Sequence, residues 1–381
     1  MSKTTTTVMD EFSKVTESII NDYVQDWKSQ GGKVVGYICC LIPKELIIAA
    51  GMLPFRVRGT GCTAPELAEK YTGSICCTYP KSFFSQAIKG EYDFLDGVVF
   101  PNNCDHYRRL FVNWPRAGMK TPFLHLVSNA KQMRPAALVW EKDEFIKLKQ
   151  HMEQHFGIKI TDENLWKAIK LSNKTRSLQR KLYELRKAKT PPISGTDTLK
   201  AMVASTAMPL DKYNQMLETL LSELKNAGAQ NNNDVRLMIV SSCLDNPVFI
   251  KMIEDLGCDV VTDFTCFGSK IMWHDINEAI KDPMEALASY YLKDQLSCAR
   301  FDGDQSRRSE HIHNMIRDFN ATGVIMDRIV FCDTWSIFNY MMEKDLKEWK
   351  VPFLPIEREY NPSFMGQLKT RVQAFLEMLR S

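Results

Sequence analysis

The stretch GVVFPNNCD at residues 97–105 decides the predicted fold. Its apolar run ends at Pro101, a polar loop follows, and a helical pattern then extends from about residue 106 to residue 114. A short apolar run bounded by turn residues is typical of a buried strand in a parallel sheet. Because similar strand–loop–helix units recur along the chain, the sequence predicts an α/β fold with parallel sheets.

Outward from this stretch, the first part of the chain repeats the pattern. The run VVGYICC at 34–40 predicts a strand, Pro43 starts a helix, residues 52–57 form a second strand, and residues 80–90 form a helix. Apolar positions at helical spacing over residues 1–30 predict one amphipathic helix, which Gly31 and Gly32 end.

The middle and the last part of the chain differ in character. Residues 145–227 are predicted to be mostly helical, with one helix reaching residue 189 and another spanning about 197–227. Further strands are expected at 235–240, 259–262, 323–331 and 353–356, with helices at 247–257 and 282–295 and a final one from about residue 362. We therefore expect two parallel-sheet, Rossmann/flavodoxin-like lobes joined by a helical insert. The predicted segments are an N-terminal helix (1–32), a first lobe (33–144), the insert (145–230) and a second lobe (231–381).

Composition excludes several classes of protein. A chain of 381 residues with 44% hydrophobic and 25% charged residues is typical of a globular protein of two or three domains. Its net charge of +3 is too small for a nucleic-acid binder. No apolar stretch is long enough to span a membrane, and the polar residues 1–10 lack a signal-peptide core, so a cytoplasmic protein is expected.

The eleven cysteines are the most informative composition feature. An odd number without an export signal argues against a disulfide framework, and no paired CxxC motif indicates a zinc ribbon. Cys104, Cys243 and Cys332 each follow a predicted strand, where ligands bind in open α/β sheets. Cys77 precedes a predicted helix, whose N-terminus favours a thiolate. Three such thiolates suit an iron–sulfur cluster with one open iron, and burial as packing residues is the alternative.

Other motifs for chemistry are missing from the sequence. It contains no G-x-x-x-x-G-K-[ST] phosphate loop, no G-x-G-x-x-G and no G-x-S-x-G. His311 and His313 are expected at the surface rather than on a metal.

Several segments together resemble the benzoyl-CoA reductase / 2-hydroxyacyl-CoA dehydratase family. They are IPKELIIAAGMLP (42–54), CTYPKS (77–82), YDFLDG (92–97) with PNNCD (101–105), and ATGVI (321–325) with FCD (331–333). CTYPKS, the form of the helical insert and CARFD (298–302) resemble most the gamma-type, smaller cluster-bearing subunit of ATP-dependent benzoyl-CoA reductase.

The resemblance implies a site. It places a [4Fe-4S] cluster on Cys77, Cys104 and Cys332, with the fourth iron position open and the cluster either single or bridged to a second one. Cys76 is an alternative to Cys77, and Cys243 and Cys298 are reserve ligands. His106 is a candidate proton donor.

Two sets of neighbouring residues carry further predictions. Asp105 and Asp333 are expected to cap the helices that follow them. Five aromatic residues could line the substrate crevice, with plain core packing as the alternative: Tyr79, Phe83, Phe84, Tyr107 and Phe111.

The resemblance also implies a function and partners. It indicates the iron–sulfur subunit of an ATP-dependent aryl-CoA (benzoyl-CoA) reductase, or alternatively a subunit of a radical 2-hydroxyacyl-CoA dehydratase. A non-catalytic electron-relay subunit and a zinc-binding structural protein are the other classes considered. Since the chain lacks a phosphate loop, ATP is expected only on partner subunits, namely an ATP-hydrolysing iron–sulfur activator. A homologous cluster-bearing subunit, an acyl-CoA substrate and an upstream ferredoxin complete the expected partners, without nucleic acid or membrane.

Overall fold

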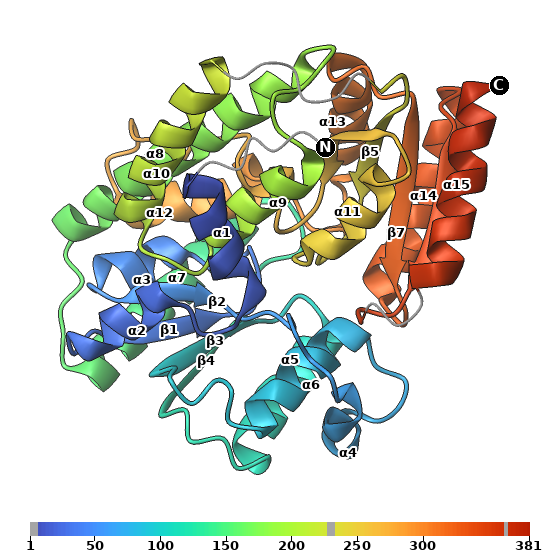
Figure 1. Ribbon diagram of the computed structural model, residues 1–381. Helices are drawn as coiled ribbons and strands as arrows, with labels where there is room; N and C mark the ends of the chain where they lie inside the picture. The colour runs from blue at the N-terminus through green and yellow to red at the C-terminus, as the bar shows by residue number, and fades with distance from the viewer. Residues whose placement is uncertain (1–6, 227–232, 362–364) are drawn as a thin grey trace.

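The computed structural model describes residues 7–226, 233–361 and 365–381, and in them the chain forms two four-stranded parallel sheets surrounded by helices (Figure 1). The first sheet has the order β2-β1-β3-β4, with strands β1 (Val34–Tyr37), β2 (Leu53–Arg56), β3 (Gly97–Pro101) and β4 (Phe123–Val127). The second sheet has the order β6-β5-β7-β8, with strands β5 (Arg236–Val240), β6 (Asp259–Phe264), β7 (Gly323–Ile329) and β8 (Phe353–Arg358). The predicted α/β fold class with two lobes is confirmed.

The helices alternate with these strands. In the first part they are α1 (Thr7–Glu17), α2 (Asp22–Ser29), α3 (Lys44–Ala49), α4 (Glu69–Thr72), α5 (Thr78–Ile88) and α6 (Asp105–Arg116). The segment of the chain that connects the two sheets contains α7 (Pro135–Phe156), α8 (Asp162–Glu184), α9 (Gly195–Ala204) and α10 (Leu210–Asn226). The last part contains α11 (Pro247–Glu254), α12 (Pro283–Ser289), α13 (Gln305–Asp318), α14 (Asp333–Glu348) and α15 (Met365–Arg380).

Strand β3 shows why the apolar run folds as it does. All five of its residues are buried, and it pairs in parallel with β1 on one side and β4 on the other. Gly97 starts the strand where a Cβ would lie 2.7 Å from the Phe123 ring, so a larger residue would push β3 and β4 apart. β3 is thus an inner strand of the sheet. The loop that follows it lies at the carboxyl edge of the sheet.

The N-terminal segment differs from the prediction of one helix. Within the described residues it forms α1 and α2, with a break at 18–21. Asn21 begins α2, because its side-chain oxygen accepts a hydrogen bond from Val24 N while its amide donates to Ala207 O at 2.9 Å. This tertiary contact, which helical spacing cannot reveal, holds Asn21 at the start of the second helix.

The middle segment is mostly helical, but the helix predicted over about 197–227 is two helices, α9 and α10. The chain turns between them just before Leu210, where Pro209 interrupts the helical pattern. Strand β4 was not predicted. The predicted segment boundary at 144/145 falls within α7, and α12 from the last part of the chain packs against α7. No helix in the described part of the chain is both long and apolar enough to cross a membrane.

Candidate functional site

The three cysteines chosen from the sequence all occupy N-cap positions. Cys77 caps α5, Cys104 caps α6 and Cys332 caps α14, and none of the three side chains makes a regular capping hydrogen bond. Cys104 and Cys332 stand at these positions because β3 and β7 end a few residues earlier. The partial positive charge of a helix N-terminus stabilises a thiolate, so at all three sites the helix acts against the burial that disfavours the ionised sulfur.

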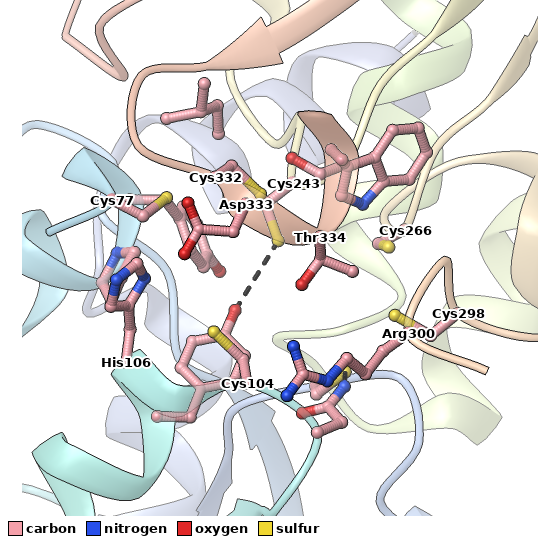
Figure 2. Close-up of a pocket in the computed structure, with 18 of the residues that line it drawn as sticks. Cys77, Cys104, His106, Cys243, Cys266, Cys298, Arg300, Cys332, Asp333 and Thr334 are labelled. Atoms are coloured by element: carbon pink, nitrogen blue, oxygen red, sulfur yellow. Dashed lines mark hydrogen bonds between the residues drawn. The ribbon is translucent and has the colours of Figure 1, made fainter. Parts of the chain in front are cut away.

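One cavity of about 720 Å³ brings these cysteines together. Figure 2 shows Cys77, Cys104 and Cys332 pointing into the same space from three separate segments. Four more cysteines line the same wall, namely Cys39, Cys243, Cys266 and Cys298. We call this opening the thiol cavity. It lies at the carboxyl ends of strands from both sheets, where open α/β sheets bind their ligands.

Cys76, the alternative to Cys77, does not line the thiol cavity. It is buried in the protein interior, where burial raises the pKa of its thiol to about 11. The lysine of CTYPKS holds the loop in front of Cys77 in place, because Lys81 Nζ donates to Glu69 Oε1 at 2.9 Å and to Ser74 O at 2.7 Å. This arrangement explains why a lysine follows the cysteine by four residues.

The three thiols have different acidities. The Cys77 thiol hydrogen-bonds to Cys332, which raises the pKa of Cys77 and lowers that of Cys332. Burial raises the pKa of Cys104 to about 12, although the N–H groups of Tyr107 and His106 oppose this effect.

His106 lies on the cavity wall in the first turn of α6. Burial lowers the pKa of this imidazole, and the nearby Asp333 carboxylate acts in the opposite direction. The neutral ring that burial favours can still donate a proton from one nitrogen. Its role as proton donor stays a prediction.

The expectation that Asp105 and Asp333 cap their helices is wrong. The N-cap positions belong to Cys104 and Cys332, and each aspartate is the first residue of its helix. Both aspartates lie on the cavity wall, and Asp105 also forms an exposed ion pair with Arg108 at 2.5 Å.

The aromatic prediction is correct in part. Tyr79 and Tyr107 line the thiol cavity, and the Tyr107 hydroxyl lies 3.8 Å from Cys243 Sγ, the contact dashed in Figure 2. The other three predicted residues pack elsewhere: Phe83 and Phe84 lie in the hydrophobic core, and Phe111 contacts Phe100.

Several wall residues were missed by sequence reasoning, including Cys39, Cys266, Arg300 and Trp335. Cys39 follows β1 and Cys266 follows β6. Both could have been predicted, because ligands of open α/β sheets bind at the carboxyl ends of the strands. Trp335 and Arg300 do not directly follow a strand, so this rule does not predict them. The expectation of a surface His311 is also wrong, because this ring is largely buried against Trp273 and Phe264, and burial lowers its pKa to about 4.

The donor set on this wall suits a cluster better than a single ion. In the described part of the chain, no three His, Cys, Asp or Glu side chains are arranged to hold one metal ion. A [4Fe-4S] cluster has a different requirement, since its thiolates bind separate irons at different corners. Thiols spread around one cavity, each at a helix N-terminus, fit a group of this kind.

This fold and site place the chain in a known class. It belongs to the family described as 2-hydroxyglutaryl-CoA dehydratase, D-component, whose model matches residues 39–379. The predicted family is therefore confirmed.

Three named relatives match this chain over almost its whole length. The chain is 27% identical to the beta subunit of (R)-2-hydroxyglutaryl-CoA dehydratase from Acidaminococcus fermentans, over 98% of this chain and 99% of that protein. It is also 27% identical to a subunit of benzoyl-CoA reductase from Thauera aromatica, over 93% and 94% of the two chains. The (R)-phenyllactyl-CoA dehydratase beta subunit of Clostridium sporogenes is 25% identical, over 97% and 98%. All three relatives are named as subunits of larger enzymes.

Proposed function

We propose that this chain is the iron–sulfur subunit of an enzyme that acts on a CoA thioester, with a [4Fe-4S] cluster held by Cys77, Cys104 and Cys332. The observation that carries the proposal is that three N-cap thiols face one cavity. When bound, such a cluster supplies single electrons of low potential and one iron open to substrate.

The chain's own residues prepare this chemistry. The N-termini of α5, α6 and α14 stabilise negative charge on the three sulfurs. Apolar and aromatic groups on the wall, among them Tyr79, Ile329 and Trp335, exclude water from reactive species. His106 holds a proton at the edge of the same space.

The reaction we propose is the ATP-dependent reductive dearomatisation of an aryl-CoA such as benzoyl-CoA, in which the ring gains two electrons and two protons. Two observations support it. The segments CTYPKS and CARFD resemble the reductase, and Cys77, Cys298 and Arg300 of these segments meet on the thiol cavity. The benzoyl-CoA reductase subunit of Thauera aromatica is among the relatives that match nearly the whole chain.

The second candidate is dehydration of a 2-hydroxyacyl-CoA, in which the substrate loses water without net gain of electrons. The description of the family model and the two dehydratase beta subunits favour it. The same thiol cavity serves either reaction, since both need one electron at a thioester carbonyl.

Partner subunits follow from the same proposal. The relatives are named as subunits, and the sequence has no phosphate loop, so ATP is hydrolysed on a separate iron–sulfur activator. A homologous cluster-bearing subunit completes the catalytic unit, and a ferredoxin supplies the electrons.

The test is anaerobic purification of this chain with its co-expressed partner subunits. About four irons and four sulfides in this chain support a single cluster, and about eight irons indicate a second cluster on the remaining cavity cysteines. Conversion of benzoyl-CoA to a cyclic diene supports the reductase, and conversion of a 2-hydroxyacyl-CoA to an enoyl-CoA supports the dehydratase. Colourless protein without iron contradicts the proposal.

A further inference from the structure

A second, smaller cavity lies near the thiol cavity. Its empty space of about 310 Å³ includes solvent at its mouth, so it has room for one small ion or one group of a larger ligand rather than for a whole organic molecule. The two cavities meet at the Cys39–Cys40 pair, because Cys39 lines the thiol cavity and Cys40 lines the second one. We call the second one the basic cavity. Its wall consists of Tyr37, Cys40, Ile42, Lys44, Arg56, Arg176, Ile271, Tyr290, Tyr291 and Gln295.

Three cations and no carboxylate line the basic cavity. One of the cations, Arg176, is neutralised by Glu45 just outside the wall, with Nη2 2.7 Å from the carboxylate. Tyr291 donates a hydrogen bond to the other oxygen of Glu45, which completes the pairing of that carboxylate. Glu45 is therefore already engaged, and Arg56 and Lys44 form no ion pair with a carboxylate among the described residues; the nearest opposing group on the wall is the Cys40 thiol, whose pKa is lowered partly by Arg56.

Of these two cations, Arg56 gives the stronger indication that the cavity binds a ligand. Its side chain is 1% exposed and stacks over Phe267, with Cζ 3.6 Å from the ring centroid. Nη1 donates to Cys266 O, but Nε and Nη2 have no hydrogen-bond partner among the described residues. Burying charged donors without partners is costly, so a group that accepts from both nitrogens would stabilise the fold. Two adjacent N–H donors of a guanidinium match two oxygens of one anion.

Two more side chains complete an anion site. The Lys44 side chain makes no hydrogen bond or ion pair within the described residues, and burial lowers the pKa of its ammonium to about 8. The amide oxygen of Gln295 also lacks a partner, while its nitrogen donates to Cys40 O at 3.3 Å. Because that oxygen can only accept, it favours an anion that still carries a proton. A carboxylate has no such proton, whereas a singly protonated phosphate has one.

We propose that the basic cavity binds a phosphate group, which Arg56 and Lys44 hold by charge and whose hydroxyl donates to Gln295. Tyr37 and Arg56 end β1 and β2, so this site lies at the carboxyl edge of the first sheet, beside the thiol cavity. The phosphate has two possible sources, free inorganic phosphate or the 3′-phosphate of a CoA thioester. The second source rests on the proposed function.

Binding of inorganic phosphate to the anaerobically purified complex, measured by titration calorimetry, tests the site. We expect about 10-fold weaker binding in Lys44→Gln and a larger loss in Arg56→Gln, since each variant removes charge-assisted hydrogen bonds. Lys142→Gln is the matched control, because Lys142 pairs with Asp282 at the surface. Lys44 lies at a partly exposed position and its side chain has no partner in the fold, so its variant stays informative if Arg56→Gln fails to fold.

Titrations with CoA and with 3′-dephospho-CoA identify the source. A preference for CoA that disappears in Lys44→Gln assigns the site to the CoA phosphate. Equal binding of the two compounds, together with Lys44-dependent binding of inorganic phosphate, assigns it to free phosphate. Undetectable phosphate binding, or binding of equal strength in wild type and both variants, overturns the proposal. Iron content is measured on the same samples, so failure of the cluster proposal is seen separately.

Discussion

The two sheets have the same strand order, yet they contribute differently to the thiol cavity. In each sheet the first and third strands are neighbours, and each of these strands is followed by a cavity cysteine. Cys39 and Cys104 follow β1 and β3, while Cys243 and Cys332 follow β5 and β7. The repeated topology thus delivers one pair of thiols from each lobe to the same space.

The lobes differ in the further cysteines that they supply to the cavity, because the first lobe adds Cys77 from a loop and the second adds Cys266 and Cys298. Cys77 precedes α5 and follows no strand, and its thiol hydrogen-bonds to Cys332 of the other lobe. Its contact lowers the pKa of Cys332, whereas burial raises that of Cys104. Burial thus acts on the pKa of both thiols, and the contact with Cys77 opposes it only at Cys332.

The largest expected effect is the loss of iron when Cys77, the loop cysteine of the first lobe, is replaced. Replacing Cys77 by alanine removes a thiol from the cavity wall, so we expect the purified chain to lose most of its iron. Cys76→Ala is the matched control, since its side chain is buried away from the cavity, and it should retain iron. Iron analysis of both variants after anaerobic purification measures the difference. Iron loss in Cys76→Ala alone would assign the ligand to the other cysteine.

The next effect compares a buried ion pair of the second lobe with a more exposed ion pair. In the second lobe, Asp327 accepts two hydrogen bonds from Arg358, each 2.9 Å long, and one from Ser241. Asp327→Ala leaves a buried guanidinium unpaired, so we expect a loss of about 3–5 kcal/mol in the free energy of unfolding. Asp275→Ala breaks the more exposed pair with Arg180 and should cost less than about 1 kcal/mol. Urea denaturation measures both, and equal losses would contradict this account.

A smaller effect concerns pH, because each lobe holds an imidazole whose pKa is strongly lowered by burial. Burial lowers the pKa of His125 in the first lobe and of His311 in the second to about 4. The unfolded chain takes up protons near pH 6.5 while the folded chain does not, so stability falls as the pH decreases from about 6.5 to 4. Each histidine should account for a loss on the order of 3 kcal/mol.

Thermal unfolding across this pH range tests the prediction. His125→Gln and His311→Gln should each flatten the dependence, and by similar amounts. His313→Gln is the control, because that ring is exposed and stacks on Trp349. A pH dependence unchanged in both buried-site variants would show that other groups control acid stability.

Much of this architecture could be predicted from local sequence. The run at 97–100 became β3, the β7 region ended before Cys332, and Asn246 caps α11 with Pro247 as its first residue. Short apolar runs and helix start signals act within a few residues, so they are visible in one sequence. The three predicted ligands lie on one cavity for the same reason, since strand ends and helix starts placed them there.

The remaining features depend on contacts between distant segments. The break between α1 and α2 needs the contact of Asn21 with Ala207, and the caps of α6 and α14 are cysteines where aspartates were expected. The basic cavity combines residues of β1, α3 and α8 with Gln295, which lies far along the chain. Local sequence patterns carry no information on contacts between segments that are far apart in the sequence.

The central claim is that strand-end thiols of both lobes hold one cluster. The most direct measurement is the iron and acid-labile sulfide content of Cys104→Ala and Cys332→Ala, with EPR after reduction by dithionite. Cys258→Ala is the control, because Cys258 is buried outside the cavity and donates to Ile253 O. The account predicts loss of iron and of the EPR signal in both ligand variants but not in the control. Full iron content in either ligand variant would contradict it.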